Sequence, residues 1–252
     1  MTRAPRRFHC EGSLAGRPAD DVLELPDGES HHLSDVLRLG LGARVTVFGD
    51  DGAAAEAEVV ATVPRVRLRL TTTATRNDPE GPRVGLAVAV LKRRAMDWTI
   101  EKATELGVAT LQPLLTARCV VPSLTEPPER WARISLAAAK QCGRNTALEI
   151  APPRSPADWT RELTCDLAPG VRVAYAHGGD APGLAEWLDA GTAKGGGAPV
   201  WVAIGPEGGW TPEECRAFDA AGFSAVGLGA LTLRAETAAL AATTLIRLHD
   251  RH

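Results

Sequence analysis

The chain has 252 residues, of which 44% are hydrophobic, and a formal net charge of -3 at pH 7. This length and apolar content predict one or two domains with a sizeable core, and no run of about 18 apolar residues indicates a membrane span. The N-terminal MTRAPRRFHC lacks the apolar segment of a secretory signal, so we expect a cytoplasmic protein.

The sequence offers no pattern typical of a metal site. Five cysteines lie far apart, with no Cys-x-x-Cys pair, which favours reduced thiols over a disulfide framework or a zinc site. The adjacent His31 and His32 would point to different faces of a helix, and no third ligand follows at metal spacing. We therefore predict no metal.

Short strands dominate the first part of the chain. RRFHC and DVLEL are followed by a predicted hairpin that turns at Asp51-Gly52 and by the strictly alternating RVRLRLT. One helix is predicted in SHHLSDVLRLG, with Leu33, Val36 and Leu37 on its buried face. Short strands with a single helix predict a small β-barrel domain over residues 1–74, and the polar stretch 73–83 is the best linker candidate.

Apolar strands alternate with helices in the rest of the chain. VGLAVAVL precedes a helix from about Arg94 to Leu106, VATLQPLL precedes a helix that ends at Gly143, and three more strand–helix units follow. This alternation predicts a parallel sheet with helices on both faces over residues 75–252.

Charge is unevenly distributed along the sequence. Residues 83–144 contain 10 Lys or Arg and 5 Asp or Glu, whereas the flanking parts are acidic. The excess is either a solvated helix face or a surface that contacts phosphate groups.

Three strands in the second half end in loops with glycine or other unusual residues: AHGGD (176–180), IGPEGG (204–209) and LGALTLR (228–234). Ligands of parallel sheets bind beyond the carboxyl ends of the strands. The second loop leads directly into a helix, which we expect to begin with a capping box of Thr211 and Glu214.

The composition of these loops argues against a phosphate ligand. No phosphate-binding glycine motif is present, and Glu207 in the second loop would repel a phosphate. A carboxylate suits a ligand with hydroxyl, amino or positively charged groups. S-adenosylmethionine has all three.

The motifs IGPEGGWTPEE and LGALTLRAETAALAA resemble those of the bacterial 16S rRNA uridine-N3 methyltransferases, a family of the SPOUT class. MDWTIEKATELGV, LQPLLTARCVV, AAAKQCGRN and the N-terminal RRFHC and HHLSDVLRLGLG extend the resemblance, in order, over nearly the whole chain. It departs at His9-Cys10 and at Ala235. The resemblance implies a deep C-terminal trefoil knot, an N-terminal PUA-like RNA-binding domain, a homodimer and S-adenosylmethionine as cofactor.

The resemblance also implies a cofactor site made of the three loops. In this class the cofactor is contacted largely by main chain, so Gly205, Gly208 and Gly209 would let the backbone approach an adenosyl group where a Cβ would intrude. The cofactor-binding residues expected on this basis are His177, Gly178, Ile204, Gly205, Glu207, Gly208, Gly209, Leu228, Gly229 and Leu233. For His177, a capping role is equally open.

Methylation of N3 of uridine requires a nitrogen that has lost its proton and donors that stabilise charge on O2 and O4. Glu236 and Arg234, expected as a pair at the start of an apolar helix, and Arg118 after the strand LQPLL are the catalytic candidates. A helix-dipole role is the simple alternative for Glu236. The residues expected to bind RNA are Arg6, Arg7, Gln141 and Arg144. Helix-end or surface roles stay open for Arg118, Gln141 and Arg144.

The resemblance implies 16S rRNA of the small ribosomal subunit as the substrate. Two alternatives stay open: the same chemistry on tRNA or large-subunit rRNA, and a non-catalytic RNA-binding protein with a relic cofactor pocket. A PUA-like domain indicates RNA in general and does not select among the targets.

Overall fold

The computed structural model describes residues 6–76, 83–119, 128–166, 171–178, 180–191 and 199–249. Its contacts divide the chain into two compact units. The N-terminal unit comprises Met1–Pro79 with Ala139–Ala147, and the C-terminal unit comprises Glu80–Ala138 with Leu148–His252. The segment 139–147 therefore packs with the N-terminal unit although it lies in the middle of the sequence. The proposed domain boundary after residue 74 stays a prediction.

The N-terminal unit is built on a six-stranded sheet in which β1, β3, β4, β5 and β2 follow one another and β6 pairs with β4. Its strands are β1 (Arg6–His9), β2 (Val22–Glu24), β3 (Arg44–Phe48), β4 (Ala53–Ala61), β5 (Arg67–Leu70) and β6 (Thr75–Arg76). The hairpin β3–β4 turns at Asp51-Gly52 as predicted, and it sets Val45 opposite Ala57. Alternate side chains of the strands, including Phe8, Val47 and Leu68, form one buried core.

The predicted closed β-barrel is not confirmed. The strands at the two ends of the path, β1 and β2, do not pair with each other in the described part of the chain. The sheet is therefore open, and the short helix α1 (Asp27–His31) and the π-helical turn η1 (His32–Val36) add Leu33 to its core.

The π-helical turn explains one error in the predicted helix. The Leu37 N–H donates to the His32 carbonyl at 3.0 Å, an i to i+5 bond that changes the angular spacing of side chains from that of an α-helix. Leu33 stays fully buried, whereas Val36 is 58% exposed. A purely α-helical period had placed both on the buried face.

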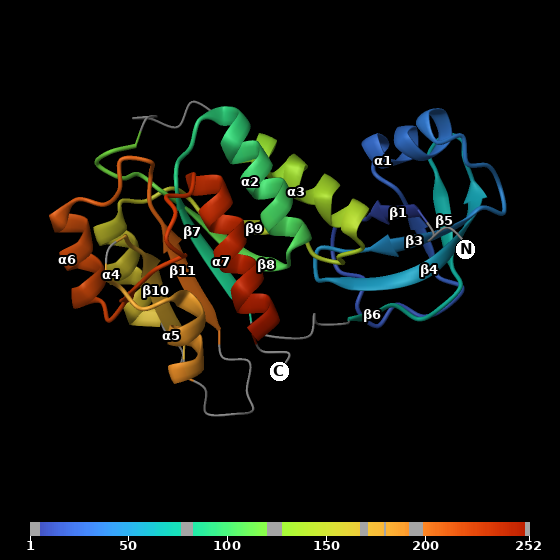
Figure 1. Cartoon of the computed structure of the whole chain (residues 1–252). Coiled ribbons are helices and arrows are strands. Elements are labelled where there is room, and N and C mark those ends of the chain that lie inside the picture. Colours follow the sequence, from blue (N-terminus) through green and yellow to red (C-terminus); the bar gives the residue numbers. More distant parts are fainter. Residues whose placement is uncertain are drawn as a thin grey trace. The chain divides into compact units, whose positions relative to one another are not determined.

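The C-terminal unit contains a parallel six-stranded sheet in the order β12-β10-β11-β7-β8-β9. Strands β7 to β11 are labelled in Figure 1. Its strands are β7 (Val84–Ala89), β8 (Val108–Leu114), β9 (Glu149–Ile150), β10 (Arg172–Ala176), β11 (Val200–Ile204) and β12 (Ser224–Val226). Its helices are α2 (Arg93–Glu105), α4 (Pro156–Asp166), α5 (Leu184–Ala190), α6 (Pro212–Ala220), α7 (Ala235–His249) and the part of α3 (Pro128–Cys142) that precedes Ala139. The predicted α/β fold with a parallel sheet is confirmed.

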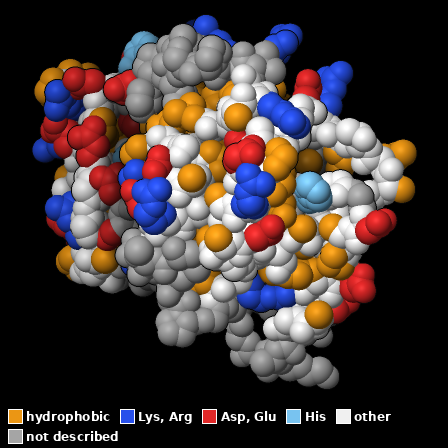
Figure 2. All heavy atoms as spheres, turned by 90° about the vertical axis from the view of Figure 1, so that its left-hand side faces the viewer, with side chains coloured by type: hydrophobic (Ala, Val, Ile, Leu, Met, Phe, Trp, Pro, Cys, Tyr) orange, Lys and Arg blue, Asp and Glu red, His pale blue; other side chains and the backbone are white. Residues whose placement is uncertain are grey.

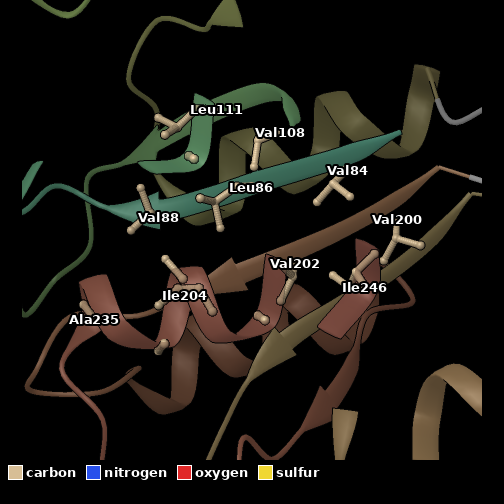
Figure 3. Packing of buried hydrophobic residues seen from close by; sticks show 14 of the residues in the cluster. Val84, Leu86, Val88, Val108, Leu111, Val200, Val202, Ile204, Ala235 and Ile246 are labelled. Atoms are coloured by element: carbon tan, nitrogen blue, oxygen red, sulfur yellow. The ribbon is translucent and has the colours of Figure 1, made fainter. Parts of the chain in front are cut away.

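Helices cover both faces of this sheet. Val84, Leu86 and Val88 of β7 and the alternate residues of β11 contribute to one core with α2, α5 and α7 (Figure 3). The other face packs Ala87 and Ala203 against aromatic residues of α4 and α6. Because β7 is buried on both faces, all six of its residues are apolar or glycine, as expected for a central parallel strand.

Gly85 in β7 has a packing reason. A Cβ at this position would lie 2.2 Å from Cδ2 of Trp201, which stands opposite Gly85 in the register of β11. The Trp201 indole therefore occupies the space that the side chain of a larger residue at position 85 would need. No helix among the described residues is long and apolar enough to cross a membrane.

Candidate functional site

The three predicted loops come together at one edge of the C-terminal sheet. Strands β12, β10 and β11 are neighbours and run parallel, so their carboxyl ends lie side by side. Two hydrogen bonds hold this edge together, both at 2.9 Å. The His177 N–H donates to the carbonyl of Val226, the last residue of β12, and Trp210 Nε1 donates to the carbonyl of Ala176, the last residue of β10. The edge beyond these strands is the candidate site.

The loop after β11 is a tight turn followed by a capped helix. The Gly209 N–H donates to the Pro206 carbonyl at 2.8 Å, and Gly209 has a φ of +69°, which favours glycine. The predicted capping box of α6 is confirmed: the Glu214 N–H donates to Thr211 Oγ1 at 3.2 Å, and the Thr211 N–H donates to Glu214 Oε2 at 2.8 Å. Glu207 and Gly208 are exposed at the tip of the turn.

The glycines of this loop differ in what surrounds them, although the sequence suggested one role for all three, close approach of the backbone to a cofactor. A Cβ at Gly205 would lie 2.9 Å from Cε2 of Trp210, so the space beside Gly205 is filled by the indole. A Cβ at Gly208 would lie 3.2 Å from Cβ of Arg118. At Gly209 and Gly229 a Cβ would meet nothing within 4 Å, and both have positive φ, of +69° and +107°. Open space for a ligand thus lies at Gly209 and Gly229.

Arg118 holds the loop after β11. Its Nη1 donates to the Gly208 carbonyl at 2.8 Å and lies 3.3 Å from the Trp210 carbonyl oxygen. The preceding Ala117 N–H donates to Glu214 Oε1 at 2.8 Å. The segment after β8 is therefore tied to the second half of the loop and to the first turn of α6. For Arg118, a catalytic candidate from the sequence, the structure shows this contact with the loop.

The third loop leads into α7. Leu228 and Leu233 are half-buried and Gly229 is exposed, whereas the side chain of Ile204 belongs to the buried core and leaves only its backbone for a ligand. The Arg234 carbonyl accepts the Ala238 N–H at 2.8 Å, which places Arg234 directly before the helix. At the same edge, His177, Gly178 and Arg234 are exposed, and Glu236 is half-buried.

The expected ion pair at the start of α7 is wrong. In the described part of the chain, no ion pair or hydrogen bond joins Arg234 to Glu236. Two residues apart across the first position of a helix, the side chains leave in different directions. Each is therefore available separately at the candidate site.

The residues expected to bind RNA lie in the N-terminal unit. Arg6 and Gln141 are exposed, and Arg7 and Arg144 are half-buried. Arg7 Nη2 donates to Asn145 Oδ1 and lies 3.4 Å from the Arg144 carbonyl oxygen, so the structure joins β1 to the segment 139–147 of the same unit. Burial lowers the pKa of the Arg7 guanidinium.

Metal ligands and thiols are two other kinds of reactive side chain. No group of three His, Cys, Asp or Glu in the described ranges could hold a metal ion. Burial raises the pKa of the Cys10 thiol to about 12, so this cysteine is not a nucleophile at neutral pH. On the described part of the face in Figure 2, Lys and Arg side chains are interspersed with Asp and Glu side chains and form no single basic patch.

Comparison with known proteins identifies the family. The RNA methyltransferase domain family matches residues 79–247. The ribosomal RNA small subunit methyltransferase E of Synechocystis sp. is 31% identical over 221 residues, which cover 86% of this chain and 70% of that protein. The chain belongs to the ribosomal RNA small subunit methyltransferase E family. The family member of Bacillus subtilis is 28% identical, and the match covers 86% of each chain.

Solved structures of similar proteins agree with this family. A ribosomal RNA small subunit methyltransferase E of Neisseria gonorrhoeae, bound to S-adenosylmethionine, is 29% identical with a TM-score of 0.80. A putative methyltransferase of Legionella pneumophila, in complex with the same cofactor, is 29% identical with a TM-score of 0.82. Each match covers 98% of both chains.

The edge of the sheet in this family member fits S-adenosylmethionine by its hydrogen-bond acceptors and its apolar surface. The exposed Glu207 carboxylate and the carbonyls of the turns can accept from hydroxyl and ammonium groups, and half-buried Leu228 and Leu233 offer apolar surface to an adenine ring. The empty space beside the Gly209 and Gly229 backbones gives the ligand access to main-chain groups.

Two residues that support this edge escaped the sequence reasoning. Trp210 packs edge-on against Phe218, with ring centroids 4.8 Å apart, and joins two of the loops through its indole N–H. Tyr175 stacks on Phe218 and donates to Asp219 Oδ1 at 3.0 Å; burial, together with this carboxylate, raises its pKa. A signal was present for Trp210, because an aromatic residue between two glycines and a helix N-cap needs a packing partner.

Proposed function

We propose that this protein is an S-adenosylmethionine-dependent methyltransferase that methylates N3 of a specific uridine in 16S rRNA of the small ribosomal subunit. The observation that carries the proposal is the convergence of three loops at the carboxyl edge of β10, β11 and β12, in a chain of this family. The named relatives act on small-subunit ribosomal RNA, and the position N3 is inferred from the sequence motifs.

The loop residues would hold the cofactor. Glu207 would accept from its hydroxyl or ammonium groups, and main chain at Gly209 and Gly229 would line it. The side chains of Leu228 and Leu233 would enclose the adenine, and the backbone of Ile204, Gly205, Gly208, His177 and Gly178 would complete the wall. When bound, the cofactor supplies an electrophilic methyl group.

Residues at the start of α7 would act on the uracil. The half-buried Glu236 carboxylate, in the first turn of α7, would accept the N3 proton. The exposed Arg234 would donate to a uracil oxygen as negative charge develops on it. We assign Arg118 to positioning the loop after β11, because its guanidinium donates to carbonyl groups of that loop.

Several finer features of the family belong to the same proposal. They are a trefoil knot at the carboxyl edge of the sheet, a PUA-like fold for residues 1–74, a methyltransferase domain over residues 75–252, and a cytoplasmic homodimer. Exposed leucines on α7 support a dimer interface, because Leu245 is 40% and Leu248 53% exposed.

Primer extension on small-subunit RNA tests the function. An N3-methyl group blocks the Watson–Crick edge of uridine and stops reverse transcriptase. A strain without this gene should lose one stop, and the purified protein with S-adenosylmethionine should restore it on undermethylated small subunits. An unchanged stop would reject the proposal. A methyl group found on tRNA or large-subunit RNA would support another target, and no cofactor binding in calorimetry would support a relic pocket.

A further inference from the structure

The N-terminal unit contains a hollow of about 610 Å³, which the proposed methyl-transfer site does not use. Its walls come from the sheet of this unit and from the segment 139–147, which packs with the same unit. A hollow of this volume is large enough for a small organic ligand. The question is which chemistry its walls would accept.

Arg7 and the loop after α3 make a fixed wall of the hollow. The Arg7 guanidinium donates to Asn145 Oδ1 and stands 5.4 Å from the centre of the Phe48 ring. At the hairpin turn, a Cβ on Gly52 would lie only 2.7 Å from Cγ2 of Thr146, so the turn fits closely against the loop. These contacts shape the hollow without a ligand.

One donor of this wall is left unsatisfied. Arg7 Nε is buried and has no hydrogen-bond partner. A buried donor without an acceptor is costly, so this atom favours a ligand or solvent oxygen at the wall. The sequence suggested Arg7 as a phosphate contact in its own right, whereas its Nη2 is already used to hold the loop.

The charges around the hollow point to a ligand with two kinds of group. Three arginines line it, namely Arg7, Arg76 and Arg144, together with a single carboxylate, Glu56. Glu56 and Arg76 are exposed, and Glu56 Oε1 accepts the Thr46 hydroxyl at 2.9 Å. The arginines favour an anionic group of the ligand. The Glu56 carboxylate would repel a second anionic group and favours a hydrogen-bond donor instead.

A nucleotide of RNA satisfies both requirements. Its phosphate suits the arginines, the N–H groups of its base suit a carboxylate, and its 2′-hydroxyl suits threonine hydroxyls such as that of Thr72. An acidic peptide would face Glu56 unfavourably. A protein partner would be expected to insert a side chain between large apolar groups, and the residues that line this hollow include none.

We propose that this hollow binds one unpaired nucleotide of the RNA substrate, with the phosphate against Arg76 and Arg144 and a base N–H donating to Glu56. The inference rests on the proposed function, because it takes RNA as the substrate. It places a base-reading contact in the N-terminal unit, on residues other than those that would hold the cofactor. An unpaired base fits because its Watson–Crick edge is free to meet a side chain.

The test compares RNA binding by three variants and the wild type. Arg76→Ala should weaken binding of a small-subunit RNA fragment about tenfold and reduce the salt slope by about one phosphate contact. Arg76→Lys should keep the slope. The matched control is Arg67→Ala, which removes an exposed arginine from β5 of the same unit outside the hollow, and it should change affinity much less. Thermal melts establish that each variant is folded.

Glu56→Gln tests the base contact. The wild type should bind the four six-nucleotide homopolymers of A, C, G and U with different affinities. Glu56→Gln should reduce this difference in affinity about fivefold or more, with an unchanged salt slope. If Glu56→Gln instead binds all four homopolymers more tightly than the wild type, with unchanged discrimination among them, the carboxylate only repels the RNA phosphates. That result would overturn the base contact. Equal affinities for Arg76→Ala and Arg67→Ala would overturn the site.

The outcomes separate this inference from the proposed function. In one outcome, the wild-type protein methylates small subunits, and Arg76→Ala binds RNA as tightly as the Arg67→Ala control. This outcome supports the function and rejects the hollow as a nucleotide site. A wild-type protein that neither binds S-adenosylmethionine nor methylates RNA, yet binds the oligonucleotides in a manner sensitive to Arg76→Ala and Glu56→Gln, rejects the function and supports the hollow.

Discussion

Replacing Gly205 by alanine should destabilise the protein through Trp210. The added Cβ would lie 2.9 Å from Cε2 and 3.2 Å from Cδ2 and Nε1 of the indole, all shorter than ordinary contacts. The ring cannot easily move away, because its N–H donates to the Ala176 carbonyl and the ring packs edge-on against Phe218. The clash must be relieved by displacing the loop or breaking that hydrogen bond.

The expected size follows from these contacts. Overpacking in a core costs about 1–3 kcal/mol, and a broken hydrogen bond costs about 0.5–1.5 kcal/mol. We expect a loss of about 2 kcal/mol in the free energy of unfolding, or roughly 4–8 °C in melting temperature for a chain of this size. Gly209→Ala is the matched control: it meets no atom within 4 Å and should lose about 1 kcal/mol from its positive φ alone.

A double-mutant cycle with Trp210→Phe isolates the clash. The smaller ring leaves room for the Cβ, so the double variant should be more stable than the sum of the single effects predicts, by at least about 0.5 kcal/mol. Thermal or urea unfolding measures each term. Additive effects would refute the packing account, and a stable Gly205→Ala that has lost cofactor binding would restore the ligand-based account that the sequence suggested.

Three further outcomes concern other parts of the molecule. Arg118→Ala should weaken S-adenosylmethionine binding about tenfold in calorimetry because two loop carbonyls lose their donor, with partial recovery in Arg118→Lys; an unchanged affinity would remove the positioning role. Glu236→Gln should lower single-turnover methyl transfer at least about a hundredfold at constant cofactor affinity and melting temperature, and a normal rate would exclude it as the proton acceptor. Burial alone would raise the pKa of the Asp51 carboxyl, but hydrogen bonds from Ser13, Ala15 and Ala53 lower that pKa to about 2. The ionised carboxylate therefore stabilises the fold above about pH 4, and this contribution is lost as the pH falls toward 2. Asp51→Asn should therefore flatten the acid limb of a stability–pH curve, and an identical limb in both proteins would contradict this.

The parallel sheet and the capped helix α6 were predictable because their signals are local. A central parallel strand must be apolar on both faces, and VGLAVA satisfies this within six residues. The capping box needs only Thr211 and Glu214, three residues apart on the same turn. Side-chain spacing within one element therefore carried both predictions.

Other features were missed because they depend on contacts between distant parts of the sequence. The alternation of β5 predicts a half-buried strand but does not say whether β1 and β2 pair, and the sheet is open. The partner of Arg7, Asn145, is 138 residues away. Nothing in the local pattern of either segment indicates this contact, and the RNA-binding role of Arg7 stays a prediction.

The candidate site shows how local and distant signals combine. The loop after β11 has a local sequence signature, but its position is fixed by side chains from elsewhere: Arg118 and the Ala117 N–H from the end of β8, and the Ala176 carbonyl from β10. Glu214 serves both levels, because one carboxylate oxygen caps α6 while the other accepts the Ala117 N–H. A loop ordered in this way loses less conformational entropy when a ligand binds, and these supporting residues should therefore control affinity for a ligand that they do not touch.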